Sequence, residues 1–218
     1  MKILDIPRSG SYQGITSSRN RFGQYVRTRA TPVNPASSFQ GTVRARMSAN
    51  AAAWRAITGI QREGWDSLGN SMVRTDSLGQ TYTLTGFQAY CSVNNVRNAD
   101  GLTAVSDPPA LTTPGTILTS AITLTAAVFS VAYTPTPMPA ATYLHVYASP
   151  QRSAGRQFEG DFRLVFVSAA AAASPANVFT AYQARLGTPV VLGRIFLSLV
   201  SASLGFESGP LLTSAVVA

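Results

Sequence analysis

The side chains that most often carry catalysis or bind metals are scarce in this sequence. Its 218 residues include one histidine, His145, one cysteine, Cys91, and nine carboxylates. A Cys/His zinc site needs several such ligands and an intrachain disulfide needs two cysteines, so both are excluded. The sequence contains no phosphate-loop, dinucleotide-binding, nucleophile-elbow or metalloprotease motif. We therefore predict that the protein is not an enzyme and has no catalytic residue, no metal site and no cofactor.

The few candidates for chemistry have simpler structural interpretations. His145 lies in a strand-like run, and we expect it to be a surface or half-buried strand residue. Cys91 fits a small buried residue on a helix. The carboxylates that could be paired lie in linkers or turns, where acidic residues make local hydrogen bonds: Asp100, Asp107, Glu159 and Asp161.

Positive charge is concentrated near the N-terminus. Residues 1–62 have a net charge of +9, whereas the rest of the chain sums to −1. Nearly all the basic residues are arginines, whose planar guanidinium groups make bidentate contacts with carboxylates and phosphates. The alternative is an ordinary solvated surface, but such a surface would mix both signs. We predict a partner-binding surface made of Arg19, Arg21, Tyr25, Arg27, Arg29, Arg44 and Arg46.

The sequence contains neither a secretory signal nor an apolar stretch typical of a membrane span. The first residues contain one lysine and a short apolar patch broken by Asp5, without the cleavage site of a secretory signal. The longest weakly apolar stretch, residues 117–133, is interrupted by Thr and Ser and alternates like strands. We expect no transmembrane helix, no membrane partner and a protein that stays where it is made.

Composition divides the chain into three regions. Residues 1–36 are rich in Gly, Pro and Arg and are expected to form an extended basic arm, with at most one hairpin over residues 22–29. Residues 37–107 carry helical patterns and are expected to form a small helical domain. A Pro-rich link at residues 107–109 precedes the Thr/Val/Ala-rich region 108–218, which is expected to be a β-sandwich. The predicted class is α+β.

Three short helices are predicted in residues 37–107. The second and third each begin with a capping box of the form Thr-x-x-Gln, in Thr58–Gln61 and Thr85–Gln88. Gly69 and Gly101 are expected to end them. The first begins near residues 37–38, because apolar residues recur there at helical spacing: Phe39, Val43, Met47, Trp54 and Ile57.

The C-terminal region has the pattern of a sandwich with one inserted helix. Ser174-Pro175 has the form of an N-cap followed by proline at the first helical position, and Gly187 closes the expected helix. Short alternating runs separated by Pro, Gly and Ser predict six or seven strands: residues 121–124, 128–133, 142–148, 162–168, 194–201 and 211–217.

Two resemblances follow from longer stretches. Residues 10–108 resemble a group of small proteins associated with tailed-bacteriophage structural genes, through the run from Arg19 to Pro35, the two tryptophan-containing helical segments, and the run from Arg74 to Gln88. The C-terminal region resembles a fibronectin type III or immunoglobulin-like module, with the inserted helix as a departure from the plain pattern.

The resemblance implies a non-enzymatic virion structural protein, either a capsid decoration or minor capsid protein or a head–tail accessory. It would be assembled in the host cytoplasm, be present as a homo-oligomer or in many copies, and dock through its arginine-rich arm onto capsid or connector subunits. The alternative is a DNA-binding protein that contacts the phosphate backbone through residues 19–29. Carbohydrate binding by the sandwich rests on fold analogy alone.

Overall fold

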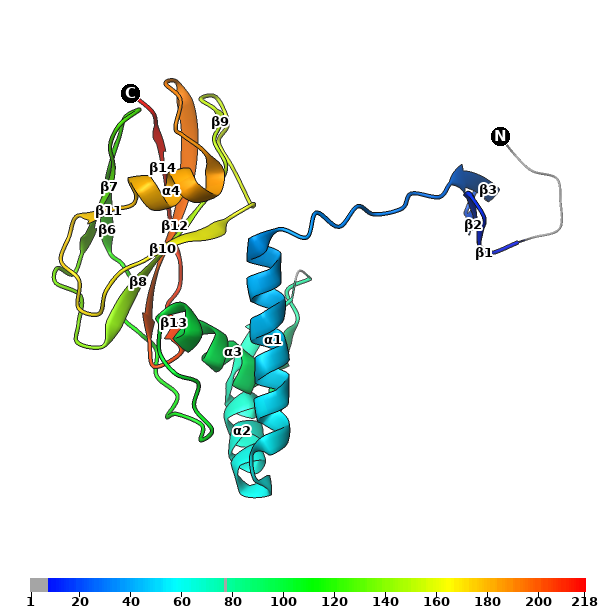
Figure 1. Ribbon diagram of the computed structural model, residues 1–218, viewed down its shortest axis with the longest axis horizontal. Coiled ribbons are helices and arrows are strands. Elements are labelled where there is room, and N and C mark those ends of the chain that lie inside the picture. The colour runs from blue at the N-terminus through cyan, green and yellow to red at the C-terminus, as the bar shows by residue number, and fades with distance from the viewer. Residues whose placement is uncertain (1–7, 77) are drawn as a thin grey trace. The chain divides into compact units, whose positions relative to one another are not determined.

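The N-terminal part of the chain forms a small antiparallel sheet (Figure 1). In the computed structural model, which describes residues 8–76 and 78–218, strands β1 (Gly10–Tyr12), β2 (Ile15–Asn20) and β3 (Gly23–Thr28) follow one another as a meander. The predicted arm therefore contains two hairpins. The chain divides into two compact units, Met1–Val43 and Arg44–Ala218, and the meander belongs to the first.

Three helices follow the meander in sequence. They are α1 (Ser38–Ala56), α2 (Gly59–Ser71) and α3 (Gly86–Ala99), with a hairpin of β4 (Val73–Thr75) and β5 (Thr81–Thr83) between the last two. Both predicted capping boxes are confirmed, because Thr58 and Thr85 each accept a hydrogen bond from the backbone of the glutamine three residues later. Gly69 does not end α2, which continues for two more residues.

Helices α2 and α3 pack around aromatic side chains. Trp65 and Tyr90 meet edge to face with ring centroids 5.1 Å apart, and the indole N–H of Trp65 donates to the carbonyl of Ser106 at 2.7 Å. Cys91 is buried in the same core, as predicted, and burial raises the pKa of its thiol. Gly69 is buried where α2 crosses the chain before α3, which explains why a glycine occurs inside this helix.

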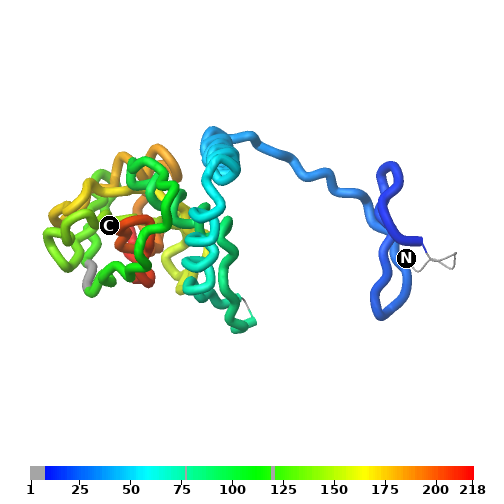
Figure 2. The backbone as a smooth tube through the Cα atoms, turned by 90° about the horizontal axis from the view of Figure 1, so that it is seen from below, coloured from blue at the N-terminus to red at the C-terminus, as the bar shows by residue number. Residues whose placement is uncertain are grey.

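The C-terminal part consists of two antiparallel sheets around one core. The larger sheet has the order β10-β8-β12-β13, with β14 and β9 also paired to β12, and the smaller has the order β11-β7-β6. In Figure 2 the C-terminus lies among the tubes of the C-terminal part, and the backbone of Ala218 donates to the carbonyl of Leu124 at 3.0 Å. The strands are β6 (Thr119–Leu124), β7 (Phe129–Thr134), β8 (Thr142–Ala148), β9 (Arg152–Ser153), β10 (Arg163–Val167), β11 (Ala176–Asn177), β12 (Gly193–Ser203), β13 (Phe206–Glu207) and β14 (Leu211–Val216).

The predicted α+β class is confirmed, since the described residues contain four helices and several antiparallel sheets. The start of the inserted helix was predicted wrongly. Helix α4 (Phe179–Leu186) is capped without a side-chain bond by Val178, whereas Ser174 accepts a hydrogen bond from the backbone of Tyr133 at 2.9 Å. The hydroxyl expected to cap the helix is therefore bonded to strand β7, and the following residues pair with that strand as β11.

The larger sheet is covered on both faces. Leu144 and Val146 of β8 pack in the core between the sheets, while His145 lies on the opposite face. That face meets the helices: Phe206 of β13 belongs to the helical core, and Gly205 lies against Val93 of α3. Gly205 has a φ of 94°, so glycine serves both a left-handed turn and a close approach at this position.

We expect the substitution Gly69→Ala to destabilise the second unit by about 1–3 kcal/mol. A Cβ atom there would lie 2.5 Å from the carbonyl oxygen of Leu84 and 3.0 Å from the carbonyl carbon of Thr85, and neither backbone atom can move without shifting α3. Urea unfolding followed by tryptophan fluorescence measures the loss. Gly59→Ala is the matched control, because its Cβ would meet nothing within 4 Å; equal effects of the two substitutions would contradict the packing argument.

Candidate functional site

The N-terminal sheet gathers five of the predicted partner-binding residues. Arg19, Tyr25 and Arg27 lie in β2 and β3, Arg21 lies in the turn between them, and Arg29 directly follows β3. The register pairs Arg19 with Gln24 and Arg27 with Thr16, which places the two arginines on opposite faces of the sheet. The arginines are thus distributed over both faces and do not form a single patch.

The described residues of this sheet form no core. None of residues 8–43 is buried, and Tyr25 is only half-buried. The guanidinium of Arg21 lies over the ring of Phe22, 4.6 Å from its centroid, and Phe22 itself is exposed. Residues 8–43 contain no carboxylate. The segment is therefore a cationic sheet whose side chains remain available to a partner.

The two other predicted partner-binding residues belong to the second unit. Arg44 is exposed and Arg46 is half-buried, both on helix α1. The structure does not place them with the arginines of the N-terminal sheet, because the two sets lie in different units.

The expectation for His145 was wrong: it is fully buried. Its Nε2 lies 2.6 Å from Oδ1 of Asp100, and its Nδ1 lies 3.1 Å from Oε1 of Glu207. Asp100 follows α3 and Glu207 lies in β13, so the contacts join the helical region to the sheet. The hydroxyl of Tyr147 also donates to Oε1 of Glu207, at 2.8 Å. The linker carboxylate Asp100 thus has a partner 45 residues away in sequence, which local patterns do not reveal.

The contacts fix the charge state of this cluster. Burial lowers the pKa of His145, but hydrogen bonds and charges from Asp100 and Glu207 outweigh it and raise the pKa to about 9. Because both acceptors are carboxylate oxygens, both ring nitrogens donate and the imidazole is a cation at neutral pH. The hydrogen bond from His145 lowers the pKa of Glu207, and burial together with Glu207 raises that of Tyr147. A protonated imidazole cannot act as a general base, so the cluster is an ion network.

A cavity of about 630 Å³ lies beside this network, between the helices and the larger sheet. Its size is within the range of small-molecule sites. Arg74, Tyr147 and Glu207 contribute polar groups, and Val96 and Val200 contribute apolar walls. The lining, all of it within the described residues, includes no histidine, cysteine or lysine, and we assign it no catalytic residue.

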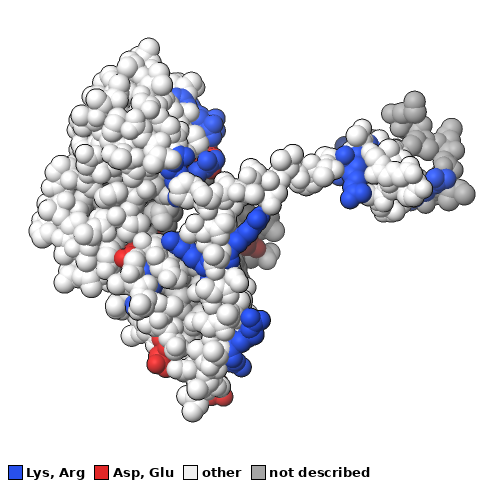
Figure 3. All heavy atoms as spheres, in the orientation of Figure 1, with Lys and Arg blue, Asp and Glu red and all other residues white. Residues whose placement is uncertain are grey.

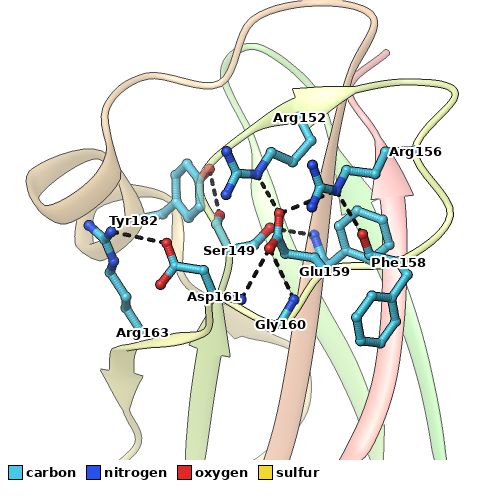
Figure 4. Close-up of polar contacts among 10 residues, drawn as sticks. Ser149, Arg152, Arg156, Phe158, Glu159, Gly160, Asp161, Arg163 and Tyr182 are labelled. Atoms are coloured by element: carbon cyan, nitrogen blue, oxygen red, sulfur yellow. Dashed lines mark hydrogen bonds and ion pairs between the residues drawn. The ribbon is translucent and has the colours of Figure 1, made fainter. Parts of the chain in front are cut away.

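A second group of arginines lies on the C-terminal sheets, where Figure 3 shows basic side chains gathered on one side. Glu159 stands at its centre and is buried; the backbone N–H of Asp161 and the Arg152 guanidinium lower its pKa to about 2 (Figure 4). Arg152 and Arg156 both contact its Oε2, and Arg163 pairs with Asp161 at 3.1 Å.

The sequence prediction missed this group because it summed charge over the whole C-terminal part, where the signs cancel. A shorter window would have found it, since five of residues 152–163 are charged in a chain with 12% charged residues. The expectation that Glu159 makes local hydrogen bonds is nevertheless confirmed, because its Oε1 accepts from the backbone of Gly160 and Asp161.

Comparison with protein-family models, curated proteins and solved structures finds no match for this chain. Among the described residues, no helix is long and apolar enough to cross a membrane. The same residues contain no group of three or more His, Cys, Asp or Glu side chains arranged to hold a metal ion.

We expect the stability of the second unit to fall as pH rises from about 6.5 through 9. The pKa of His145 is about 9 in the folded chain and 6.5 as its ordinary value, so its contribution is complete below 6.5 and is lost above 9. The free energy of unfolding should decrease by up to about 3 kcal/mol across this window. Urea unfolding between pH 6 and pH 10 measures it.

Two variants separate this effect from general alkaline unfolding. In His145→Gln the free energy of unfolding should no longer depend on pH between 6.5 and 9. At pH 6 it should be lower than in the unaltered chain, because Asp100 loses its cationic partner. Tyr147→Phe keeps both contacts of His145 and should retain the dependence. A pH profile unchanged by His145→Gln would refute the assignment.

Proposed function

We propose that this chain is a non-enzymatic structural protein of a bacteriophage particle, a capsid decoration or minor capsid protein or a head–tail accessory, present in several copies. The observation that carries the proposal is the N-terminal sheet, in which none of residues 8–43 is buried. Small sheets gain stability by packing one face against another layer. A sheet that finds no such layer among residues 8–43 is suited to being completed by a neighbouring subunit.

The positive charge of residues 8–43 favours a partner whose surface is acidic. Residues 8–43 include arginines on both faces of the sheet and no carboxylate, so an acidic surface on a capsid or connector subunit is its complement. The two outer strands, β1 and β3, also leave one backbone edge each for pairing with a strand of that subunit. Arg19, Arg21, Tyr25, Arg27 and Arg29 are the contact residues of this proposal, with Arg44 and Arg46 as a second set on α1.

We also propose that the C-terminal sheets are an immunoglobulin-like or fibronectin type III-like module, displayed on the particle. Two antiparallel sheets sharing one core support this, as does a length of about 100 residues. Helix α4 is an insertion into that pattern. Phe158 is 75% exposed and would be available for contacts on the displayed surface.

Limited trypsin digestion tests the proposal. In the isolated chain we expect the first cuts after Arg19, Arg21, Arg27 or Arg29, because a sheet without buried side chains opens at little cost. In particles sedimented from a lysate of the source, the same bonds should be protected. Mass analysis of the fragments gives the sites. Cuts inside the second unit, for example after Arg97, serve as the internal control and should be late in both samples.

Two results would count against a structural role. One is a chain that never sediments with particles, and the other is an N-terminal sheet equally resistant to trypsin in the isolated chain and in particles.

The second candidate function is DNA binding. It is favoured because residues 8–43 contain arginines and no carboxylate that would repel phosphate groups. If it holds, the chain should retard duplex DNA, and the affinity should fall steeply with salt, by a slope of about −0.9 per phosphate contact. Replacing Arg19, Arg21, Arg27 and Arg29 by Ala should abolish the retardation, whereas replacing all four by Lys should preserve it, because phosphate attraction requires only the charge. No salt-sensitive shift in the unaltered chain would eliminate this function.

A further inference from the structure

Glu159 lies in the loop between β9 and β10, where hydrogen bonds hold its carboxylate in place. Its side chain is only 5% exposed, and its Oε1 accepts from the backbone of Gly160 at 3.0 Å and of Asp161 at 3.1 Å. These bonds use one carboxylate oxygen, Oε1, and leave the other, Oε2, to the two arginines. Figure 4 shows Arg152 and Arg156 both directed at this carboxylate.

Both arginines meet Glu159 through Nε, at the side of the guanidinium group. Arg152 donates from Nε to Oε2, and the Nε of Arg156 lies 3.5 Å from the same oxygen. The Nε of Arg156 also donates to the carbonyl of Phe158 at 2.7 Å. Among the described residues, the terminal nitrogens of the two arginines form no hydrogen bond. The two guanidinium groups therefore meet at one carboxylate oxygen through Nε, and their terminal nitrogens are left for another ligand.

Neighbouring residues hold this arrangement and add positive charge. The Nη1 of Arg194 donates to the carbonyl of Arg156 at 3.0 Å, which fixes the loop that carries it. Arg163 engages Asp161 through Nη2, so its forked end is already occupied. Burial and the charge of Arg163 lower the pKa of Arg185, which places another cation nearby. Three arginines, Arg152, Arg156 and Arg163, thus contact two carboxylates, and the local excess of charge is positive.

We propose that Arg152 and Arg156 form a binding site for a tetrahedral oxyanion of the phosphate class, positioned by Glu159. A guanidinium fork binds two oxygens of such an anion in parallel, and a tetrahedral dianion has enough oxygens for both forks. Their side chains are 33% and 46% exposed, so an anion reaches them from solvent while the stems stay packed. All residues of this site belong to the second unit, and the site does not depend on the function proposed above.

A titration of the full chain with sodium phosphate tests the site. Ionic strength is held constant with sodium chloride, and the arginine Nε–H resonances are followed by NMR. We expect saturable shifts for Arg152 and Arg156, and a dissociation constant at least tenfold weaker in Arg156→Gln, since a charge-assisted pair is lost. Glycerol phosphate in a parallel titration distinguishes a free anion from a phosphate ester: shifts with both mean that the site accepts an esterified phosphate, and shifts with inorganic phosphate alone mean a free anion.

Arg163→Gln is the matched control. It removes the same charge from the same side of the sheets, but this guanidinium is already paired with Asp161, so phosphate binding should stay within about twofold of the unaltered chain, as expected for a screened exposed charge. Equal weakening by Arg163→Gln and Arg156→Gln would reduce the effect to net charge and overturn the proposal. So would the absence of saturable shifts in the unaltered chain.

A third variant tests the role of the forked guanidinium group of Arg152. In Arg152→Lys the charge remains but the fork is lost, so binding should weaken although net charge is unchanged. Thermal unfolding of each variant is measured beside the titration. If Arg152→Lys proves unfolded, the comparison of Arg156→Gln with Arg163→Gln decides alone, because both of these arginines are about half exposed.

Discussion

Strand β12 is buried on both faces along nearly its whole length, and other elements of the second unit pack around it. A strand in a two-layer sandwich needs an apolar layer on one face only, but residues 195–202 are buried on both. The inner face packs in the core between the sheets. On the outer face of the same sheet, His145 contacts Asp100 at the end of α3, and Phe206 belongs to the helical core. Helices α2 and α3 are therefore part of one compact unit with the C-terminal sheets. The ion network of His145, Asp100 and Glu207 lies in this second layer, where a buried cation is tolerable only because two carboxylates meet it.

Much of the local structure was accessible from sequence because it rests on local chemistry. The Thr-x-x-Gln boxes of Thr58 and Thr85 act within one helical turn, and the alternation in residues 142–148 predicted β8 with its observed bounds. The start of α4 was not accessible in the same way. Ser174-Pro175 satisfies the local rule for a helix start, yet the Ser174 hydroxyl bonds to Tyr133, 41 residues away. A tertiary hydrogen bond displaced a local preference.

The candidate sites also differ in how far they depend on local sequence and how far on tertiary contacts. The cationic N-terminal segment is visible in composition, and its residues do meet in one sheet, but their distribution over two faces depends on the register. His145 looked like an ordinary strand residue because its partners are 45 and 62 residues distant. The arginines around Glu159 come from β9, the following loop and β12, and summed charge conceals them. Sequence alone identifies which residues carry charge, whereas the fold decides which charges face one another.

The lack of buried side chains in residues 8–43 also bears on how this segment changes over time. In a packed domain most substitutions are filtered first by their cost to folding. In a sheet without a core that filter is weak, and selection acts mainly through whatever the surface touches. Substitutions in residues 8–43 therefore cost little folding free energy, whereas substitutions in the second unit, with its doubly covered strand, are limited by the stability of the fold.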